Sequence, residues 1–515
     1  MRSTVPPPVS VYHELKSRLR EAATLGSIGS LVAWDQETYM PPAAASFRAE
    51  QIAVLRGIVH QRFTDPRIGE LLSACESDRA LTGDPTTADA ANIREIRRKY
   101  DRATRLPLDL VRELARVGSQ AQEAWKHARE ANDFPAFAPW LEKVMALTRR
   151  KAECYQAGQQ LAPGTELYDA LLDEHEPGAT ARQIAGVFAP LAPRLGTLVR
   201  QIGAAKRSPG DAPLRVSIDP DRQHVLGQRV VGALGFDFSA GRLDTTTHPF
   251  CSGIAPGDTR LTTRYRESSW TDALFGSLHE AGHGLYEQGL PKAGHLGEPL
   301  CQSISLGIHE SQSRMWENFV GRSREFWSWL TPIVRETAEG GLDGYSADDL
   351  YAAANIVRPS FIRVEADEAT YNLHVMIRFE IERAFFVGDL SVADIPGEWN
   401  RKYKQYLGVD VPDNKRGCLQ DVHWSFGLIG YFPTYTLGNL YAAQFYETIR
   451  ADIPNLDARI AVGDFSPLKT WLNTNIHAHG MRYRAAELCE KLTGKPLGPD
   501  PLMRHLEGKL LPLYK

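Results

Sequence analysis

The sequence has no long apolar run. No stretch approaches the roughly 18 to 20 uninterrupted apolar residues that a membrane-spanning helix requires. The opening residues MRSTVPPPVS also lack the apolar centre of a signal peptide. We therefore expect a soluble, cytoplasmic protein with no membrane partner.

An excess of positive charge is missing as well. The chain has 59 Lys and Arg residues against 63 Asp and Glu residues, which gives a formal net charge of −4. Binding to the phosphates of a nucleic acid requires a basic surface. DNA and RNA are therefore not expected as partners.

Cysteine is scarce and widely spaced. The 515 residues contain six cysteines, at positions 75, 154, 251, 301, 418 and 489, and no two of them form a Cys-x-x-Cys pair. This spacing excludes both a zinc site made of paired thiolates and a disulfide scaffold. We expect six free thiols, in agreement with a reducing cytoplasm.

Internal repeats and low-complexity linkers are absent too, so a single domain, residues 1–515, is favoured over a chain of separate modules. Hydrophobic residues make up 43% of the chain and charged residues 24%, as in ordinary globular proteins. We divide this domain into an N-terminal helical part, about 10–205, and a catalytic part, about 206–515.

Apolar residues at helical spacing predominate on both sides of one irregular region. Between 208 and 265, clusters of Pro, Gly and Asp separate short segments such as 215–218 and 260–265, where we place a small sheet. Beyond it, helices are predicted at 271–288, 302–321, 360–386, 436–451 and 478–493. The predicted fold class is therefore mainly α, with a small β-sheet.

One segment carries a metal-binding pattern. In FGSLHEAGHGLY, residues 275–286, His279 and His283 lie one helical turn apart, so their side chains leave the same face and can share one ion. Glu280 lies next to them, where it can activate a water. Zinc binds imidazole and carboxylate, and a catalytic zinc needs three protein ligands and an open position. Cobalt or manganese can occupy similar sites.

A chance match on an ordinary helix is the competing interpretation, because a lone histidine is usually a core or surface group. Gly282 and Gly284 favour a functional reading, since each weakens a helix by about 1 kcal/mol relative to Ala. Glycine at these positions is expected where a substrate or a packed partner approaches the backbone closely.

A third ligand must come from elsewhere in the chain. Glu310, in GIHESQSR, follows His283 by 27 positions on another apparent helix. That distance allows a loop and a return. His309 could bind the metal instead, since imidazole is a common zinc ligand. Spacing alone leaves both residues as candidates.

Several longer strings resemble one known family, the carboxypeptidase Taq type of metallocarboxypeptidases. The likeness covers nearly the whole chain, in WDQET (34–38) with MPP (40–42), YDALL (168–172) with EPG (176–178), HPF (248–250), DTRLT (258–262), the motif around His279, HESQSR (309–314), RPS (358–360) through EADE (365–368), and GYFPTY (430–435). The resemblance implies a mostly helical fold with a long substrate groove, a homodimer, and removal of C-terminal residues one at a time from peptide substrates. The resemblance also implies that Glu310, rather than His309, is the third ligand.

Peptide hydrolysis needs a base and a donor for the developing oxyanion. We assign Glu280 as the base that accepts a proton from water and passes it to the departing amine. The segment 423–435 offers donors, of which we favour Tyr431 and His423, with Tyr435 in reserve. These rings could equally be core residues with hydrogen-bonded polar tips.

A carboxypeptidase must also recognise a free carboxylate, for which the planar fork of arginine is well suited. Arg358 is the favoured candidate and Arg363 the second. The alternative is that both form weak ion pairs with the acidic residues of 365–368 on the same helix.

His248 is a candidate for hydrogen bonding to the substrate backbone, unless residues 248–250 form a turn that only shapes the groove floor. Asp258 and Arg260 are expected to pair structurally. Two rival functions remain, a zinc endopeptidase or oligopeptidase and a non-catalytic peptide-binding protein. The intact Glu280 argues against the second.

Overall fold

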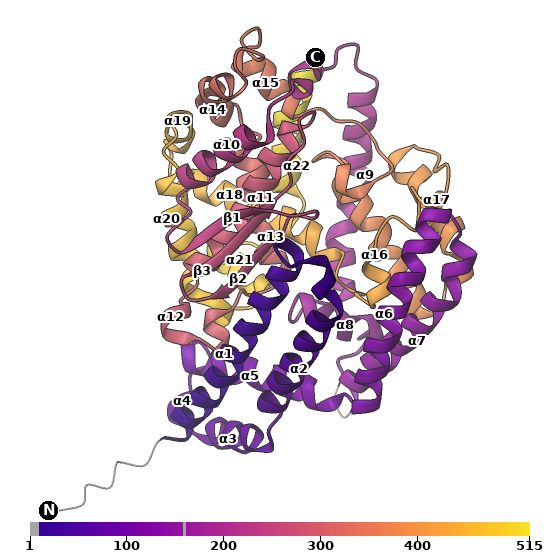
Figure 1. Ribbon diagram of the computed structural model, residues 1–515, viewed down its shortest axis with the longest axis vertical. Helices are drawn as coiled ribbons and strands as arrows, with labels where there is room; N and C mark the ends of the chain where they lie inside the picture. Colours follow the sequence, from indigo (N-terminus) through magenta and orange to yellow (C-terminus); the bar gives the residue numbers. More distant parts are fainter. Residues whose placement is uncertain (1–9, 158–160) are drawn as a thin grey trace, which may run out of the picture.

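The computed structural model describes residues 10–157 and 161–515, and the predicted fold class is confirmed (Figure 1). Up to Gly203, the regular elements within these ranges are all helices. They include α1 (Val11–Thr38), α2 (Ala45–Phe63), α3 (Pro66–Ser77), α4 (Arg79–Thr82), α5 (Ala88–Arg105), α6 (Leu108–Ala131), α7 (Phe134–Gln156), α8 (Leu167–His175) and α9 (Ala181–Gly203). No helix in the described residues is long and apolar enough to cross a membrane.

Side-chain caps begin several of these helices at the breaks seen in the sequence. Asp65 accepts a hydrogen bond from the backbone of Arg67 at the start of α3, with Pro66 in the first turn. Thr180 and Gln183 form a capping box at the start of α9, directly after the EPG turn. Pro107 precedes the first residue of α6. The proline and polar breaks therefore fix where the helices start.

Two cores hold the molecule together. A small one joins α1, α3 and α5 through nine buried apolar residues, including Leu15, Leu72 and Ile96. The main core draws on buried side chains from Leu110 to Tyr514. Helix α2 has no buried residue. It packs along α1 and leaves apolar side chains such as Phe47 and Val54 exposed.

The small sheet has three strands, β1 (Gly241–Thr245), β2 (Cys251–Ala255) and β3 (Asp258–Thr263), in the order β1-β3-β2. Strand β3 is parallel to β1 and antiparallel to β2. The prediction of a strand at 215–218 is wrong. Arg215 ends a 3-10 turn, Ala212–Arg215, in which the backbone oxygen of Pro213 accepts a hydrogen bond from Trp270. Farther along the stretch, the backbone N–H of Ile218 donates to the backbone oxygen of Glu267 at 3.2 Å.

The remaining helices are α10 (Pro220–Ala233), α11 (Trp270–Gly289), α12 (Lys292–His295), α13 (Leu306–Arg314), α14 (Arg324–Thr337), α15 (Ala347–Ala354), α16 (Tyr371–Val387), α17 (Ile395–Leu407), α18 (Pro433–Asp452), α19 (Leu456–Ala461), α20 (Ser466–Asn475), α21 (Ala485–Thr493) and α22 (Asp500–Leu510). A π-helical turn, Met315–Val320, continues α13. The helix predicted from 360 begins only at Tyr371, because Asp367 caps the backbone just before it. The helix predicted from 478 begins at Ala485, after Gly480 packs on Leu300.

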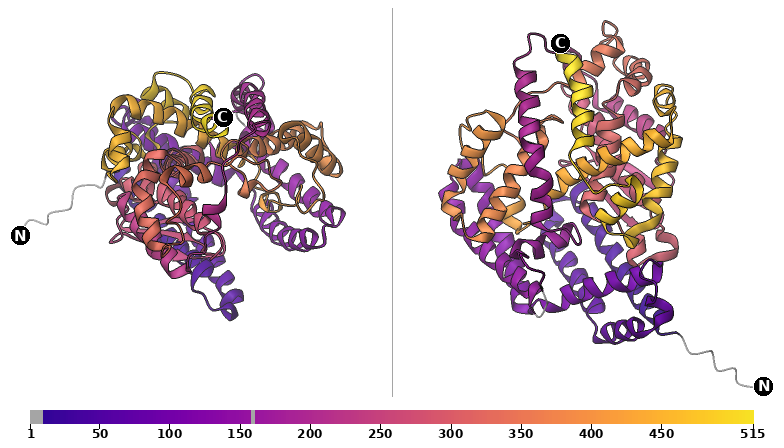
Figure 2. Two further views of the ribbon diagram at one scale, coloured as in Figure 1. Left: turned by 90° about the horizontal axis from the view of Figure 1, so that it is seen from above. Right: turned by 180° about the vertical axis from the view of Figure 1, so that it is seen from behind.

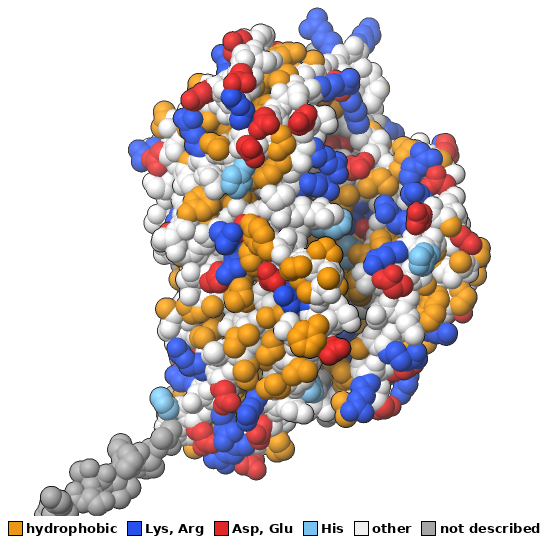
Figure 3. Space-filling model, in the orientation of Figure 1, with side chains coloured by type: hydrophobic (Ala, Val, Ile, Leu, Met, Phe, Trp, Pro, Cys, Tyr) orange, Lys and Arg blue, Asp and Glu red, His pale blue; other side chains and the backbone are white. Residues whose placement is uncertain are grey.

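The helices gather into two lobes, as the view from above shows (Figure 2). Helices α6, α7, α9, α16 and α17 form one lobe, and the sheet with α10, α11, α13, α18 and α20 forms the other. At the back, α9 runs beside α22, joined by an ion pair between Arg194 and Asp500. The surface is hollowed between the lobes, and histidine side chains are visible inside the hollow (Figure 3). The division of the chain near residue 205 stays a prediction.

Candidate metal centre

Helix α11 carries both histidines of the motif. The rings of His279 and His283 face the same side, with centroids 4.9 Å apart. A Cβ atom on Gly282 would lie 2.5 Å from the backbone oxygen of Gln312 in α13. One on Gly284 would lie 2.6 Å from Leu261 in β3. The two glycines therefore let α13 and the sheet approach the histidine helix from two sides.

Helix α13 brings Glu310 to the same point. Its Oε2 lies 3.7 Å from Nε2 of His279 and 3.5 Å from Nε2 of His283. Behind it, α18 approaches closely at Gly438, where a Cβ atom would lie 2.5 Å from Cγ of Glu310. One ligand atom from each of the three side chains lies within 4.8 Å of the others. This close grouping is what a single ion requires.

The remaining polar atoms of these three side chains already have partners. Nδ1 of His279 lies 2.9 Å from Oε2 of Glu317. Nδ1 of His283 lies 2.5 Å from Nδ1 of His309. Oε1 of Glu310 accepts a hydrogen bond from Nε of Arg314 at 2.7 Å. Such outer partners orient ligands. Three donors, two nitrogens and one oxygen, are thus left facing one another, a set that fits a divalent ion such as zinc.

His309, the alternative ligand, is placed differently. Its Nδ1 faces His283, and its Nε2 lies 2.8 Å from Oε1 of Glu287. Both ring nitrogens therefore have partners within the protein. This arrangement favours Glu310 as the third ligand.

Burial sets the charge of the central groups. It raises the pKa of Glu280 to about 7, so this carboxyl can take up a proton near neutral pH. Burial, reinforced by His309, lowers the pKa of His283 to about 3 and keeps this ring neutral. For His279, burial lowers the pKa, but the charge of Glu310 and the hydrogen bond to Glu317 outweigh it, and the net shift of the pKa is upward. A neutral imidazole is the form that binds a metal.

Four rings form an aromatic cluster beside this centre: Tyr371, His423, Tyr431 and Tyr435. The ring of Tyr431 lies 5.4 Å from that of His423 and 5.5 Å from that of Tyr435. Burial raises the pKa of Tyr431, and the charge of Glu310 adds to the shift, so this phenol lies near the ligands. Burial lowers the pKa of His423 to about 4. Both groups are therefore neutral hydrogen-bonding groups at pH 7.

The two candidate arginines have different surroundings. Arg363 is buried, donates from Nε and Nη2 to Oδ1 of Asp421 and lies 4.9 Å from the ring centre of Tyr435. Arg358 is 61% exposed and pairs with Asp211 at 3.0 Å. Neither pairs with the acidic residues of 365–368 through its side chain, and neither lies on a helix longer than one turn. Only Arg363 joins the aromatic cluster.

His248 lies in an exposed loop between β1 and β2. The next residues are fastened to the sheet, because the backbone N–H of Phe250 donates to Oγ1 of Thr262 at 2.8 Å. Asp258 and Arg260 pair with each other at 2.8 Å, and Arg260 lies over the ring of Trp34. The pairing predicted for this string is present, and it ties the sheet to α1.

Comparison with known proteins decides the family. The protein-family model described as "Carboxypeptidase Taq (M32) metallopeptidase" matches residues 14–510. The chain belongs to this family. It is 47% identical to "Thermostable carboxypeptidase 1" of Thermus thermophilus, covering 98% of this chain and 99% of the relative. It is 38% identical to "Carboxypeptidase 1" of Bacillus subtilis, over 94% and 95% of the two chains.

The solved structures agree. The M32 carboxypeptidase from Deinococcus radiodurans R1 superposes with a TM-score of 0.93 at 42% identity, covering 98% of this chain and 99% of that one. Membership of the M32 family confirms the resemblance, the fold class and the assignment as a metallocarboxypeptidase, a peptide hydrolase. It implies a divalent metal ion. The endopeptidase alternative is not favoured.

Several residues around the candidate metal centre were not predicted from the sequence. Glu287 and Glu317 contact His309 and His279, and Tyr371 accepts a hydrogen bond from Nη1 of Arg363. A signal existed for the two glutamates. Glu287 follows His283 by one helical turn, and Glu317 follows Glu310 by about two, so each faces the same side as its neighbour. Tyr371 gave no such signal.

Proposed function

We propose that His279, His283 and Glu310 hold one ion, zinc by preference, and that the enzyme uses it to remove C-terminal residues from peptides. The observation that carries this proposal is the convergence of three donor atoms within 4.8 Å, each side chain held from behind by a partner. When bound, such an ion lowers the pKa of a coordinated water from about 15.7 to about 7. Cobalt and manganese are the alternatives to zinc.

Glu280 is the proposed general base. It neighbours His279 on α11 and is buried, and burial raises its pKa to about 7. A carboxylate of this basicity takes a proton from the attacking water and returns it to the departing amine. It is not one of the three side chains whose donor atoms converge, and the charges of His279 and Glu310 act on its pKa, which supports a role beside the ion.

Tyr431 and His423 are the proposed donors to the developing oxyanion. Both are neutral at pH 7, and Tyr431 is close enough to Glu310 for the charge of that carboxylate to raise its pKa. A donor aimed at the oxyanion stabilises the transition state more than the substrate. Tyr435, which contacts Tyr431 and Arg363, belongs to the same aromatic cluster and is proposed to bind substrate.

The free carboxylate of the substrate is proposed to meet Arg363. Two guanidinium groups, those of Arg363 and Arg378, share Asp421, so two positive charges against one negative leave a net charge of +1. Only one residue, which spans about 3.5 Å, separates the cleaved bond from the free carboxylate. The group that binds the carboxylate must therefore lie near the cleaved bond. Arg363 beside the aromatic cluster meets this condition. This reverses the order expected from the sequence, in which Arg358 is favoured, and makes Arg358 the second candidate. His248 stays a candidate for hydrogen bonding to the substrate backbone.

We further propose that the enzyme is a cytoplasmic homodimer. Helix α2 exposes Phe47 and Val54 at 64% and 61%, an apolar surface that a second copy could cover. All six cysteines are free thiols, as expected in a reducing compartment. Light scattering should give twice the chain mass of 57.3 kDa. A Phe47→Glu variant should give the monomer mass, and a monomeric parent would refute the homodimer.

One experiment tests the activity. Matched peptides with a free or an amidated C-terminus are digested by zinc-loaded, chelated and reloaded protein, and the products are read by mass. We expect a ladder from the C-terminus of the free acid only, lost on chelation and restored by zinc. Internal fragments from both peptides would instead indicate an endopeptidase.

A further inference from the structure

The two histidines of the centre are supported in different ways. His279 contacts a carboxylate directly, with its Nδ1 2.9 Å from Oε2 of Glu317. His283 contacts another imidazole, with Nδ1 of its ring 2.5 Å from Nδ1 of His309. The carboxylate on this side, Glu287, comes one step later, 2.8 Å from Nε2 of His309.

Only one order of protons satisfies this chain. A histidine that binds a metal through Nε2 carries its hydrogen on Nδ1, so His283 must donate to Nδ1 of His309. His309 then carries its own hydrogen on Nε2 and donates it to Oε1 of Glu287. The other oxygen of Glu287 accepts from Lys292. Each of the three links therefore joins one donor to one acceptor.

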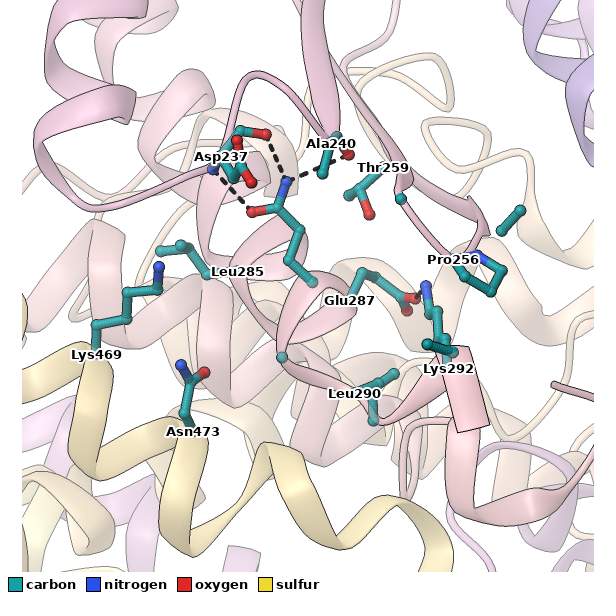
Figure 4. A pocket seen from close by; sticks show the side chains of 15 residues that line it. Asp237, Ala240, Pro256, Thr259, Leu285, Glu287, Leu290, Lys292, Lys469 and Asn473 are labelled. Atoms are coloured by element: carbon teal, nitrogen blue, oxygen red, sulfur yellow. Dashed lines mark hydrogen bonds and ion pairs between the residues drawn. The ribbon is translucent and has the colours of Figure 1, made fainter. Parts of the chain in front are cut away.

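The outer end of the series lies at a cavity of about 300 Å³ near the C-terminal end of α11. Figure 4 shows the carboxylate of Glu287 and the ammonium of Lys292 facing each other in its wall. Their side chains are 15% and 10% exposed. Gly253 makes room for them, because a Cβ atom there would lie 1.9 Å from Oε2 of Glu287. The sheet therefore leaves space for this ion pair.

We infer that His309, Glu287 and Lys292 form a relay that fixes the tautomer and orientation of His283, so that they act as positioning residues for the metal. The relay rests on the proposed metal site. A second imidazole between ligand and carboxylate extends the usual outer support of a metal-binding histidine by one group. Removing a link leaves the ring of His283 free to turn or to change tautomer.

Two variants and one control test the relay. His309→Phe removes both hydrogen bonds at similar volume, and Glu287→Leu with Lys292→Met removes the ion pair without leaving one charge buried. We expect zinc affinity, from chelator competition, to fall about 10–100-fold in the first and about tenfold in the second. Gln288→Leu, on the same cavity wall but bonded to Asp237, should bind zinc as the parent does.

The melting temperature of the metal-free protein and the visible spectrum of the cobalt-loaded protein separate positioning from packing. If the relay positions His283, the variants that break it should shift the visible absorption bands of bound cobalt, because the ligand field from His283 changes. Affinities within twofold of the parent would overturn the inference. So would weaker binding with unchanged cobalt bands and a lowered melting temperature. A parent that binds no metal would instead overturn the proposed function.

Discussion

The metal centre and the aromatic cluster lie side by side but are built differently. The centre takes its ligands from two helices, α11 and α13, and each ligand is held by a carboxylate, imidazole or guanidinium behind it. The aromatic cluster is assembled from α16, the segment around His423 and the start of α18, around the buried pair of Arg363 and Asp421. The difference indicates a division of labour. We propose that the centre, with Tyr431 and His423 as its donors to the oxyanion, performs the reaction on any peptide bond. The rest of the cluster, with Arg363, is proposed to select which bond is presented.

The sharpest test of the metal centre is Glu280→Gln. It removes the base and keeps the shape of the side chain, so we expect kcat to fall about 10²–10⁴-fold. Zinc content, measured by elemental analysis, should stay at one ion per chain. The loss should be equal for peptides that differ in their C-terminal residue. Undiminished turnover would remove Glu280 from the reaction.

A smaller loss is expected at the boundary between the two regions. Tyr431→Phe deletes the phenol hydroxyl and leaves the ring in contact with His423, so the packing persists. Loss of one oxyanion donor should lower kcat by about 10²-fold, with KM little changed. Steady-state kinetics on one peptide measures both constants. A rise in KM alone would assign Tyr431 to substrate binding instead.

The two regions also differ in how far the sequence could predict them. His279, Glu280 and His283 follow from helical spacing within five positions. Glu310 needed the family resemblance, because the 27 positions from His283 fix no path through space. Contacts of the aromatic cluster, such as Arg363 with Asp421, join residues 58 positions apart and leave no local periodicity. The same reason explains the wrong strand at 215–218, where Ile218 bonds to the backbone of Glu267, 49 positions away.

A test of substrate selection compares the two arginines. Arg363→Gln leaves Asp421 paired with Arg378, so the fold should survive. Loss of a charged hydrogen bond of about 1.5–3 kcal/mol should reduce the preference for free-acid over amidated peptides about 10–100-fold. Arg358→Ala should change this preference less than about threefold, because its surface ion pair contributes little. The opposite ranking would make Arg358 the carboxylate receptor.

The dependence of kcat/KM on pH should report the metal centre alone. Glu280 must be ionised to accept a proton, so activity should fall about tenfold per pH unit below its pKa. Burial puts this pKa at about 7, and the positive charge of a bound ion lowers it from there. His423 stays neutral above about pH 4 and adds no step in this range. If the fall in kcat/KM at low pH were unchanged in Glu280→Gln, the titration behind it would belong to another group.

The smallest effect separates the regions most cleanly. Zinc at 100 times its Kd stabilises the folded chain by about 2.7 kcal/mol. For 515 residues the unfolding entropy is about 1.1 kcal/mol per kelvin, so the melting temperature should rise about 2–3 °C. His283→Ala should abolish this rise, whereas Arg363→Gln should keep it in full, as calorimetry can show. If the Arg363 variant also lost the rise, the aromatic cluster would be part of the metal centre and the proposed division of labour would fail.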